Sequence, residues 1–256
     1  MDRRDFIKKT AMTVAGTAVT APVMAMLTNN ENMDLLEKET EKTALNSSDK
    51  KIKVLMINGS PRRDGNTYIA LKEVESQLTK HGIETEILQI GNGAVNMCIN
   101  CGNCRNTDDG CVFDEDICNT IATKMKTADA MIVGSPVYYG QPNGGILAVM
   151  QRLFYSSGQI VKDKPAAAIA ICRRGGATAA LQTLNMMFEM MNMPVVTSQY
   201  WNIAYGSSKG EVKLDTEGMQ TMRTLGNNMA WLLEKIHAGG KDAPERERGV
   251  YMNFIR

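Results

Sequence analysis

The stretch that most constrains this 256-residue chain is a short apolar run followed at once by a glycine-rich turn. Residues 53–58 read KVLMIN, which has the length and branching expected of a strand buried in a parallel sheet. The turn GSPRRDGNT occupies residues 59–67, and a helical pattern follows it. A strand that runs through such a turn into a helix N-terminus forms an anion site, because backbone N–H groups and the helix dipole point at the bound group. We therefore predict a phosphate-binding loop here.

The side chains of this turn suit the same role. Ser60 and Thr67 carry hydroxyl groups, Asn66 is a good N-cap residue, and Arg62 and Arg63 supply full charges for phosphate oxygens. The alternative is an ordinary loop with surface arginines. The turn lacks the Gly-Lys-Ser/Thr ending of an NTPase P-loop, the G-x-G-x-x-G spacing of a dinucleotide fold and the cysteine of a phosphatase loop.

The rest of the chain alternates strand and helix patterns. Further strands are expected over residues 83–90, 129–135, 165–171 and 194–201, and helices over 66–80, 119–127, 143–157, 178–191 and 216–237. Five strands alternating with helices predict an α/β fold with a doubly wound parallel sheet. In the flavodoxin-like order 2-1-3-4-5, a crevice lies at the carboxyl ends of the first and third strands. The turn at 59–67 and the loop at 136–140 fall at those two ends.

The loop GSPRRDGNT resembles the phosphate loop of flavodoxin-like proteins, in particular the NADPH-dependent FMN reductase and iron–sulfur flavoprotein families. The likeness extends over about residues 51–237 and implies FMN as the ligand. In the resembled family FMN is surrounded by this loop, the loop at 136–140 and the loop at 173–176. The expected FMN-binding residues are Ser60, Arg62, Asn66, Thr67, Pro136, Val137, Tyr138, Tyr139, Gly140, Arg173, Gly175 and Gly176.

The second loop, at 136–140, and the third loop, at 173–176, contain residue types that suit a flavin ring. Residues 136–140 offer apolar and aromatic surface, and the arginines of the third loop can stabilise a reduced, anionic flavin. Tyr138 and Tyr139 could instead pack at a helix start. Arg173 and Arg174 could simply be solvated, and we expect only one of them to touch the cofactor.

Four cysteines gather in an irregular insert between the second and third strands: Cys98, Cys101, Cys104 and Cys111. All four lie within 14 residues and can converge on one centre. The run of two-residue spacings is typical of a cubane cluster, whereas zinc sites more often pair two Cys-x2-Cys units across a longer spacer. The run resembles the cysteine motif of iron–sulfur flavoproteins, which implies a [4Fe–4S] cluster. Disulfides or free thiols are an alternative in an oxidising compartment, and zinc is another.

The first 25 residues form a separate pattern. The basic start RRDFIKK precedes a weakly apolar stretch with a small residue near Ala25, as in a secretory signal. Arg3 and Arg4, followed by x-Phe-Ile-Lys, resemble a twin-arginine export signal, which predicts a periplasmic protein exported with its cofactor in place. A signal that does not function would leave the protein in the cytoplasm, and an uncleaved one would anchor it to the membrane. We interpret residues 26–50 as a polar linker, 51–237 as the FMN-binding domain and 238–256 as a C-terminal tail.

Composition excludes several other functions. The chain has 29 Lys and Arg against 28 Asp and Glu, so its charge gives no reason to expect a nucleic-acid partner. Only two histidines are present, which leaves little scope for a Ser-His-Asp triad. We assign no catalytic side chain, and expect the chemistry to belong to a cofactor. Cys118 and Cys172, outside the run, are interpreted as small hydrophobic residues.

Together these patterns predict an exported FMN-dependent oxidoreductase. It would accept a hydride from NAD(P)H, or electrons from another carrier, and pass them to a cluster, a quinone or another acceptor. We expect a small-molecule or protein redox partner and a homodimer or higher homo-oligomer. The alternatives are an electron-transfer flavoprotein without an NAD(P)H site, and a thiol redox or metal-binding module whose flavin is structural.

Overall fold

The computed structural model of the protein describes residues 51–106, 110–238 and 243–244. The predicted signal at 1–25, the linker at 26–50 and most of the tail at 238–256 lie outside these residues, so those interpretations stay predictions. Within the described ranges, the helices are too short or too polar for any of them to span a bilayer.

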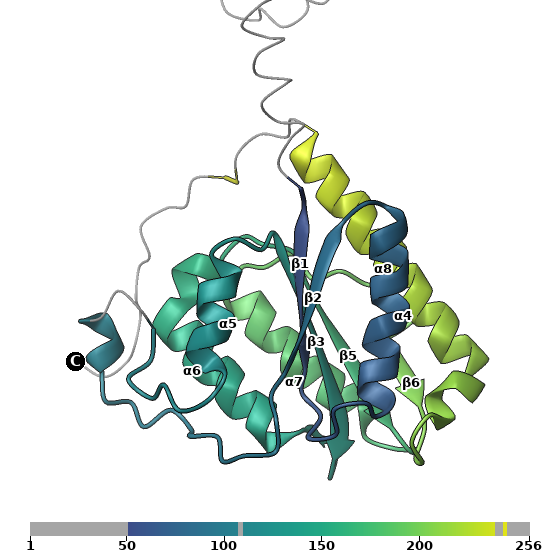
Figure 1. Cartoon of the computed structure of the whole chain (residues 1–256), viewed down its shortest axis with the longest axis horizontal. Helices are drawn as coiled ribbons and strands as arrows, with labels where there is room; N and C mark the ends of the chain where they lie inside the picture. Colours follow the sequence, from purple (N-terminus) through teal and green to yellow (C-terminus); the bar gives the residue numbers. More distant parts are fainter. Residues whose placement is uncertain (1–50, 107–109, 239–242, 245–256) are drawn as a thin grey trace, which may run out of the picture. The chain divides into compact units, whose positions relative to one another are not determined.

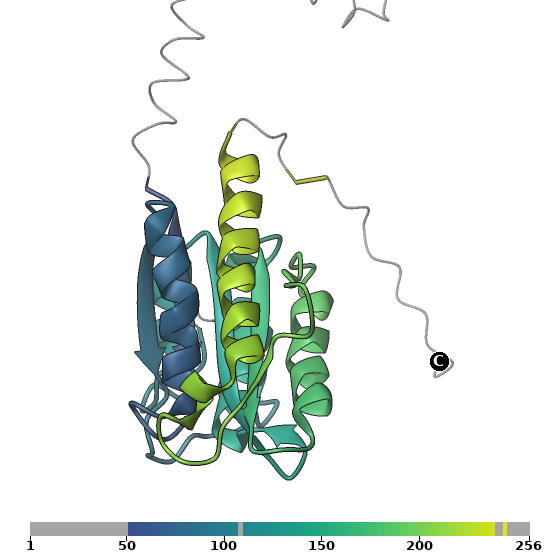
Figure 2. The same ribbon diagram turned by 90° about the vertical axis from the view of Figure 1, so that its right-hand side faces the viewer.

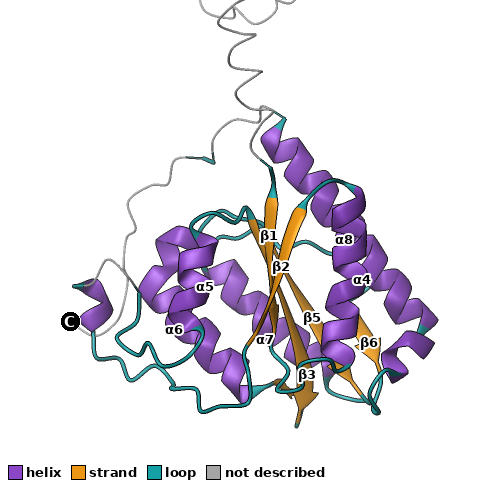
Figure 3. Ribbon diagram, in the orientation of Figure 1, coloured by secondary structure: helices purple, strands orange, loops and turns teal. Residues whose placement is uncertain are grey.

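The domain alternates strands and helices along the chain (Figures 1 and 3). Its strands are β1 (Lys53–Asn58), β2 (Glu84–Gln89), β3 (Ala130–Tyr138), β4 (Gln141–Pro142), β5 (Ala166–Cys172) and β6 (Ile203–Tyr205). Its helices are α4 (Asn66–Lys80), α5 (Cys118–Met125), α6 (Gly144–Val161), α7 (Ala177–Met190) and α8 (Thr216–His237). Two short 3₁₀ turns cover Asn103–Arg105 and Glu211–Leu214.

The strand order is β2-β1-β3-β5-β6, and all neighbours in this path run parallel. The two-residue β4 lies outside the path and pairs antiparallel with the end of β3. Counting the five parallel strands in sequence gives 2-1-3-4-5, which confirms the predicted flavodoxin-like doubly wound fold. The central strand β1 is buried at every position after Lys53, whereas the edge strand β2 is only partly buried, as its alternating sequence predicts.

Helices cover both faces of the sheet (Figure 1), and Figure 2 looks onto the face covered by α4 and α8. α4 and α8 pack against one face with Val54 and Met56 of β1. α5, α6 and α7 pack against the other face with Leu55 and Ile57. Successive residues of β1 therefore enter two different cores, because side chains alternate across a strand.

The last strand differs from the prediction of a strand over residues 194–201. Only Val195 forms a bridge, to Ala166, and the regular strand β6 begins at Ile203. Between them the chain turns away from β5, because the Ser198 hydroxyl donates to the Tyr200 carbonyl at 2.7 Å and the Asn202 amide donates to the Val196 carbonyl at 3.3 Å. These polar side chains satisfy the backbone locally and displace the strand toward the carboxyl edge of the sheet.

Candidate functional site

The loop between β1 and α4 is fixed by side chains at the ends of two strands. Asn58 Oδ1 accepts from the Ser60 N–H at 3.1 Å, and Asn58 Nδ2 donates to Gln89 Oε1 at 2.5 Å. Gln89 Nε2 in turn donates to the Ser60 carbonyl, and Ser60 Oγ accepts from the Arg62 N–H at 3.1 Å. The turn therefore has its shape before any ligand arrives.

The start of α4 corrects one prediction. The N-cap residue is Gly65 and not Asn66, and no side chain caps the helix. The Asn66 side chain instead holds the loop after β6: it donates to the Ser208 carbonyl at 2.9 Å and accepts from the Gly210 N–H at 2.9 Å. The N–H groups of the first helical turn have no acceptor within the helix, and that turn contains no acidic residue, so the helix end favours an anion.

This turn forms one side of a crevice of about 210 Å³ at the carboxyl ends of β1, β3 and β5. Eight of the twelve predicted FMN-binding residues line it: Ser60, Arg62, Asn66, Thr67, Pro136, Val137, Tyr138 and Arg173. Five further residues, which were not predicted as site residues, also line it: Gly65, Ile171, Cys172, Gly206 and Ser207. Gly206 and Ser207 were missed because the last strand was placed too early. The Gly-Ser-Ser sequence that follows Tyr205 was the available signal.

The other four predicted residues do not line the crevice: Tyr139, Gly140, Gly175 and Gly176. Tyr139 and Gly140 have φ angles of 51° and 79° and form the tight turn between β3 and β4, where Tyr139 is fully exposed. Gly176 has a φ of 86°, and a Cβ there would come within 2.7 Å of the Gly140 Cα. Gly140 and Gly176 thus let two loops pack backbone against backbone beside the crevice.

The loop after β6 is held in place by carboxylates. Glu211 accepts from the Ser207 and Ser208 N–H groups, both at 2.7 Å, and these bonds hold the pKa of Glu211 below its ordinary value. Lys209 forms an ion pair with Asp64 of the phosphate-binding turn and lowers the pKa of that carboxyl group. The crevice is therefore bounded by segments that lie far apart in the sequence.

The two cysteines outside the run are buried, as predicted. Burial raises the pKa of the Cys118 thiol to about 12. It also raises the pKa of the Cys172 thiol, although the Arg174 and Ala177 N–H groups oppose this. Cys172 nevertheless lines the crevice, which its interpretation as a small hydrophobic residue did not anticipate.

The four cysteines of the run, Cys98, Cys101, Cys104 and Cys111, surround a second, small cavity of about 20 Å³. All of them are free thiols, and a set of four thiols is the donor set of an iron–sulfur cluster. The space is that of about one water molecule, so the loop has to widen to admit a cluster. Within the described residues, no three Cys, His, Asp or Glu side chains are grouped closely enough for a single metal ion.

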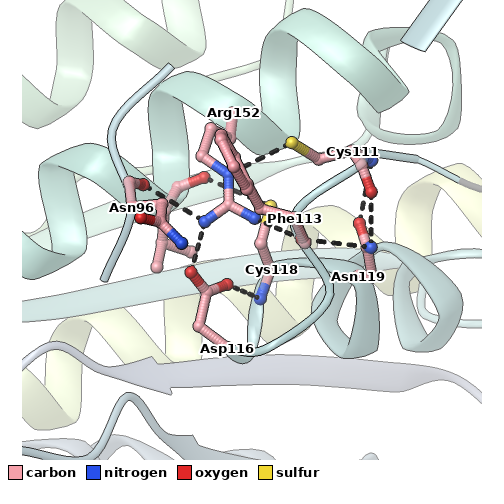
Figure 4. Close-up of polar contacts among 8 residues, drawn as sticks. Asn96, Cys111, Phe113, Asp116, Cys118, Asn119 and Arg152 are labelled. Atoms are coloured by element: carbon pink, nitrogen blue, oxygen red, sulfur yellow. Dashed lines mark hydrogen bonds and ion pairs between the residues drawn. The ribbon is translucent and has the colours of Figure 1, made fainter. Parts of the chain in front are cut away.

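Helix α6 supplies the side chains that face this loop. Tyr155 Oη accepts from Arg105 Nη2 at 3.3 Å and donates to Asn100 Oδ1 at 3.2 Å. Arg152 is completely buried, and its Nε donates to Cys111 Sγ at 3.2 Å (Figure 4). Arg152 was not predicted as a site residue, although a basic residue within the apolar helix sequence ILAVMQRLF was a signal for it.

Comparison with known proteins agrees with this arrangement. Residues 52–208 match the family described as NADPH-dependent FMN reductase. The chain belongs to that family. The resemblance inferred from the phosphate-binding turn is thereby confirmed.

Two relatives of this family member carry the name iron-sulfur flavoprotein. One, from Methanocaldococcus jannaschii, is 33% identical over 197 residues, which cover 72% of this chain and 99% of the relative. The other, from Methanosarcina thermophila, is 31% identical over 191 residues, covering 72% and 97%.

Two solved structures share the fold. A flavone reductase is 18% identical, with a TM-score of 0.55 over 72% of this chain and 64% of its own. RosB with a bound 8-demethyl-8-formylriboflavin-5'-phosphate intermediate is 16% identical, with a TM-score of 0.54 over 80% and 94%.

Proposed function

We propose that this protein is an FMN-dependent oxidoreductase that oxidises NAD(P)H and reduces a further acceptor. The observation that carries the proposal is the crevice at the carboxyl ends of β1 and β3. That edge is the topological switch point at which doubly wound sheets bind their ligands. Arg62 and Arg173 line the crevice, and none of its lining residues in the described chain is acidic, which suits a phosphorylated ligand.

Different residues of the crevice would bind different parts of FMN. Ser60, Thr67 and the first N–H groups of α4 would receive the phosphate, with Arg62 as the charged partner. Val137 and Tyr138 would support the flat ring, and Arg173 would face its polar edge. FMN, when bound, supplies hydride and single-electron chemistry, which is why the site needs no acid–base pair of its own.

We further propose that the four-cysteine loop holds a [4Fe–4S] cluster. The support is the set of four free thiols around one cavity, together with the names of the relatives in the family. Zinc, which four thiolates also bind, is the alternative, and iron and sulfide analysis of the protein distinguishes the two.

Anaerobic turnover tests the proposed reaction. Protein loaded with FMN should lose its oxidised-flavin absorbance when NADPH or NADH is added, and should then reduce a soluble quinone. Flavin that is reduced by dithionite but by neither nucleotide would favour the electron-transfer flavoprotein instead. A protein that retains no FMN on gel filtration would contradict both. Thiol titration with and without a chelator distinguishes the thiol redox or metal-binding module.

We also propose export through the twin-arginine route, supported by the Arg3-Arg4 pair. Changing both to Lys should retain the protein in the cytoplasm, because Arg and Lys present different donor geometry to a receptor. Fractionation of the native host checks this, and an unchanged distribution between compartments would contradict it.

A further inference from the structure

We propose that Arg152 is a positioning residue that raises the reduction potential of the four-cysteine centre by acting on Cys111, and that Asp116 moderates its charge. The inference rests on the proposed cluster, and it assigns a role to a residue outside the cysteine motif.

Arg152 is a buried charge that is almost completely satisfied. Its side chain is 0% exposed, and that of its ion-pair partner Asp116 is 6% exposed. It donates to the carbonyls of Asn96 at 3.2 Å and Phe113 at 2.6 Å, and its guanidinium lies 5.4 Å from the centre of the Phe113 ring (Figure 4). Burial alone would lower the pKa of Arg152, but the hydrogen bonds to Asp116 and Cys111 more than offset this, so it stays charged.

A buried ion pair is seldom retained for stability, because removing two charges from water costs about as much as their attraction returns. The direction of the remaining donor indicates another use. Arg152 Nε points at Cys111 Sγ, 3.2 Å away, and not at a backbone carbonyl. Helix α6 therefore places a permanent positive charge next to the sulfur of Cys111, one of the four proposed ligands.

Cys111 is also held differently from the other three cysteines. Asn119 of α5 accepts from the Cys111 N–H at 2.9 Å and donates to its carbonyl at 2.7 Å, so the backbone of Cys111 is clamped (Figure 4). Within the described residues, no charged side chain donates to the sulfur of Cys98, Cys101 or Cys104. The centre is thus asymmetric. The Cys111 sulfur accepts a hydrogen bond from a buried charge, whereas Cys101 is exposed and Cys98 and Cys104 are partly buried without such a donor.

The sign of the effect follows from charge. Reduction adds an electron to the cluster, and a nearby cation and an N–H···S hydrogen bond both stabilise the added negative charge. The effect of Arg152 on the reduction potential is large because its guanidinium is buried, so solvent screens its charge little. Asp116 carries the opposite charge, so it partly cancels the field of Arg152.

Variants that shift the reduction potential in opposite directions distinguish this role of Arg152 from a purely structural one. Arg152→Gln combined with Asp116→Asn removes the charge and the bond to sulfur without leaving a lone buried carboxylate, and should lower the potential. Asp116→Asn alone should raise it. Arg152→Lys keeps the charge but not the planar N–H donor, and should fall between wild type and the double variant. A purely structural Arg152 would change cluster content and not shift the potential in both directions.

The experiment is a redox titration of full-length protein reconstituted with FMN, iron and sulfide, followed by electron paramagnetic resonance. We expect the double variant to shift the equilibrium with a reference dye at least about tenfold, or 59 mV for one electron. Arg105→Gln is the matched control, because Arg105 is a basic residue of the cysteine loop itself, but its side chain is exposed and donates to Tyr155 Oη. It should shift the equilibrium less than about twofold, since exposed charges are screened.

Several outcomes would overturn the inference. Potentials that do not move, or that move the same way in both Asp116→Asn and the double variant, would refute the role of Arg152 while leaving the cluster intact. Wild-type protein without iron would refute the proposed cluster, and the inference with it. If the double variant does not assemble a cluster, opposite shifts in Arg152→Lys and Asp116→Asn decide the question, and shifts of one sign refute it.

Discussion

The FMN crevice and the four-cysteine loop are built in different ways. The crevice is made where strands of one parallel sheet end, so the sheet brings its loops together, and side chains such as Asn58 and Asn66 then fix those loops. The described residues of the cysteine loop contain little regular structure beyond the 3₁₀ turn at Asn103–Arg105, and side chains of α5 and α6 position them. The first site is prepared by the regular sheet together with side chains that fix its loops, whereas the second depends on a few polar side chains and on its ligand. We therefore expect the two to fail independently.

The largest expected effect is on the cysteine loop. Replacing any one of Cys98, Cys101, Cys104 or Cys111 by Ser should remove most of the bound iron, because each iron of the cluster needs its thiolate. FMN content should stay at the wild-type level, since the phosphate-binding turn lies at another strand end. Iron, sulfide and flavin analysis of anaerobic protein measures both. Cys118→Ala is the control, because this buried thiol lies outside the proposed ligand set. Parallel loss of iron and FMN would contradict independence.

The next effect tests the phosphate-binding turn. Arg62→Ala should weaken FMN binding by about 1.5–3 kcal/mol, the range for a hydrogen bond to a charged group. Arg63→Ala is a matched control, because Arg63 precedes the same helix but does not line the crevice. Titration of the apoprotein with FMN, followed by flavin fluorescence, gives both dissociation constants. Equal losses in the two variants would show that only net charge matters.

Two neighbouring glycines test whether backbone geometry prepares the crevice. Gly176→Ala should cost about 1–2 kcal/mol in the free energy of unfolding, because its φ of 86° disfavours a side chain. A Cβ on residue 176 would also lie only 2.7 Å from the Gly140 Cα, so Gly140 would have to move. Gly175→Ala meets nothing within 4 Å and should be nearly neutral. Urea unfolding compares the two, and equal stability of both variants would contradict this account of the loop contact.

The smallest effect concerns pH. The folded-state pKa values of Glu211 and Asp64 lie below their ordinary values. The two carboxylates therefore stabilise the folded protein above about pH 4.5, and this stabilisation is lost as the pH falls through their folded-state pKa values. Wild type should therefore lose stability relative to Glu211→Gln as the pH falls below about 4.5. Urea unfolding of both proteins across this range measures the difference. A difference in the free energy of unfolding that does not change with pH would show that the charge of Glu211 does not stabilise the fold.

The sequence predicted the fold and most of the crevice because both depend on patterns that are local. The run at 53–58, the turn at 59–67 and the apolar strand of residues 129–135 each carry their own signal, and parallel pairing brings their ends together. The predicted N-cap role of Asn66 was wrong because the partners of its side chain, Ser208 and Gly210, lie more than 140 residues away. Arg152 was missed for the same reason, since only the folded chain shows that it faces Cys111 and Asp116.

The most direct test of the central claim is cofactor analysis of wild-type protein prepared without oxygen, reconstituted and passed through gel filtration. The account predicts about one FMN and about four iron atoms per chain. Protein that keeps its iron but releases all FMN would contradict the assignment of the crevice at the ends of β1 and β3.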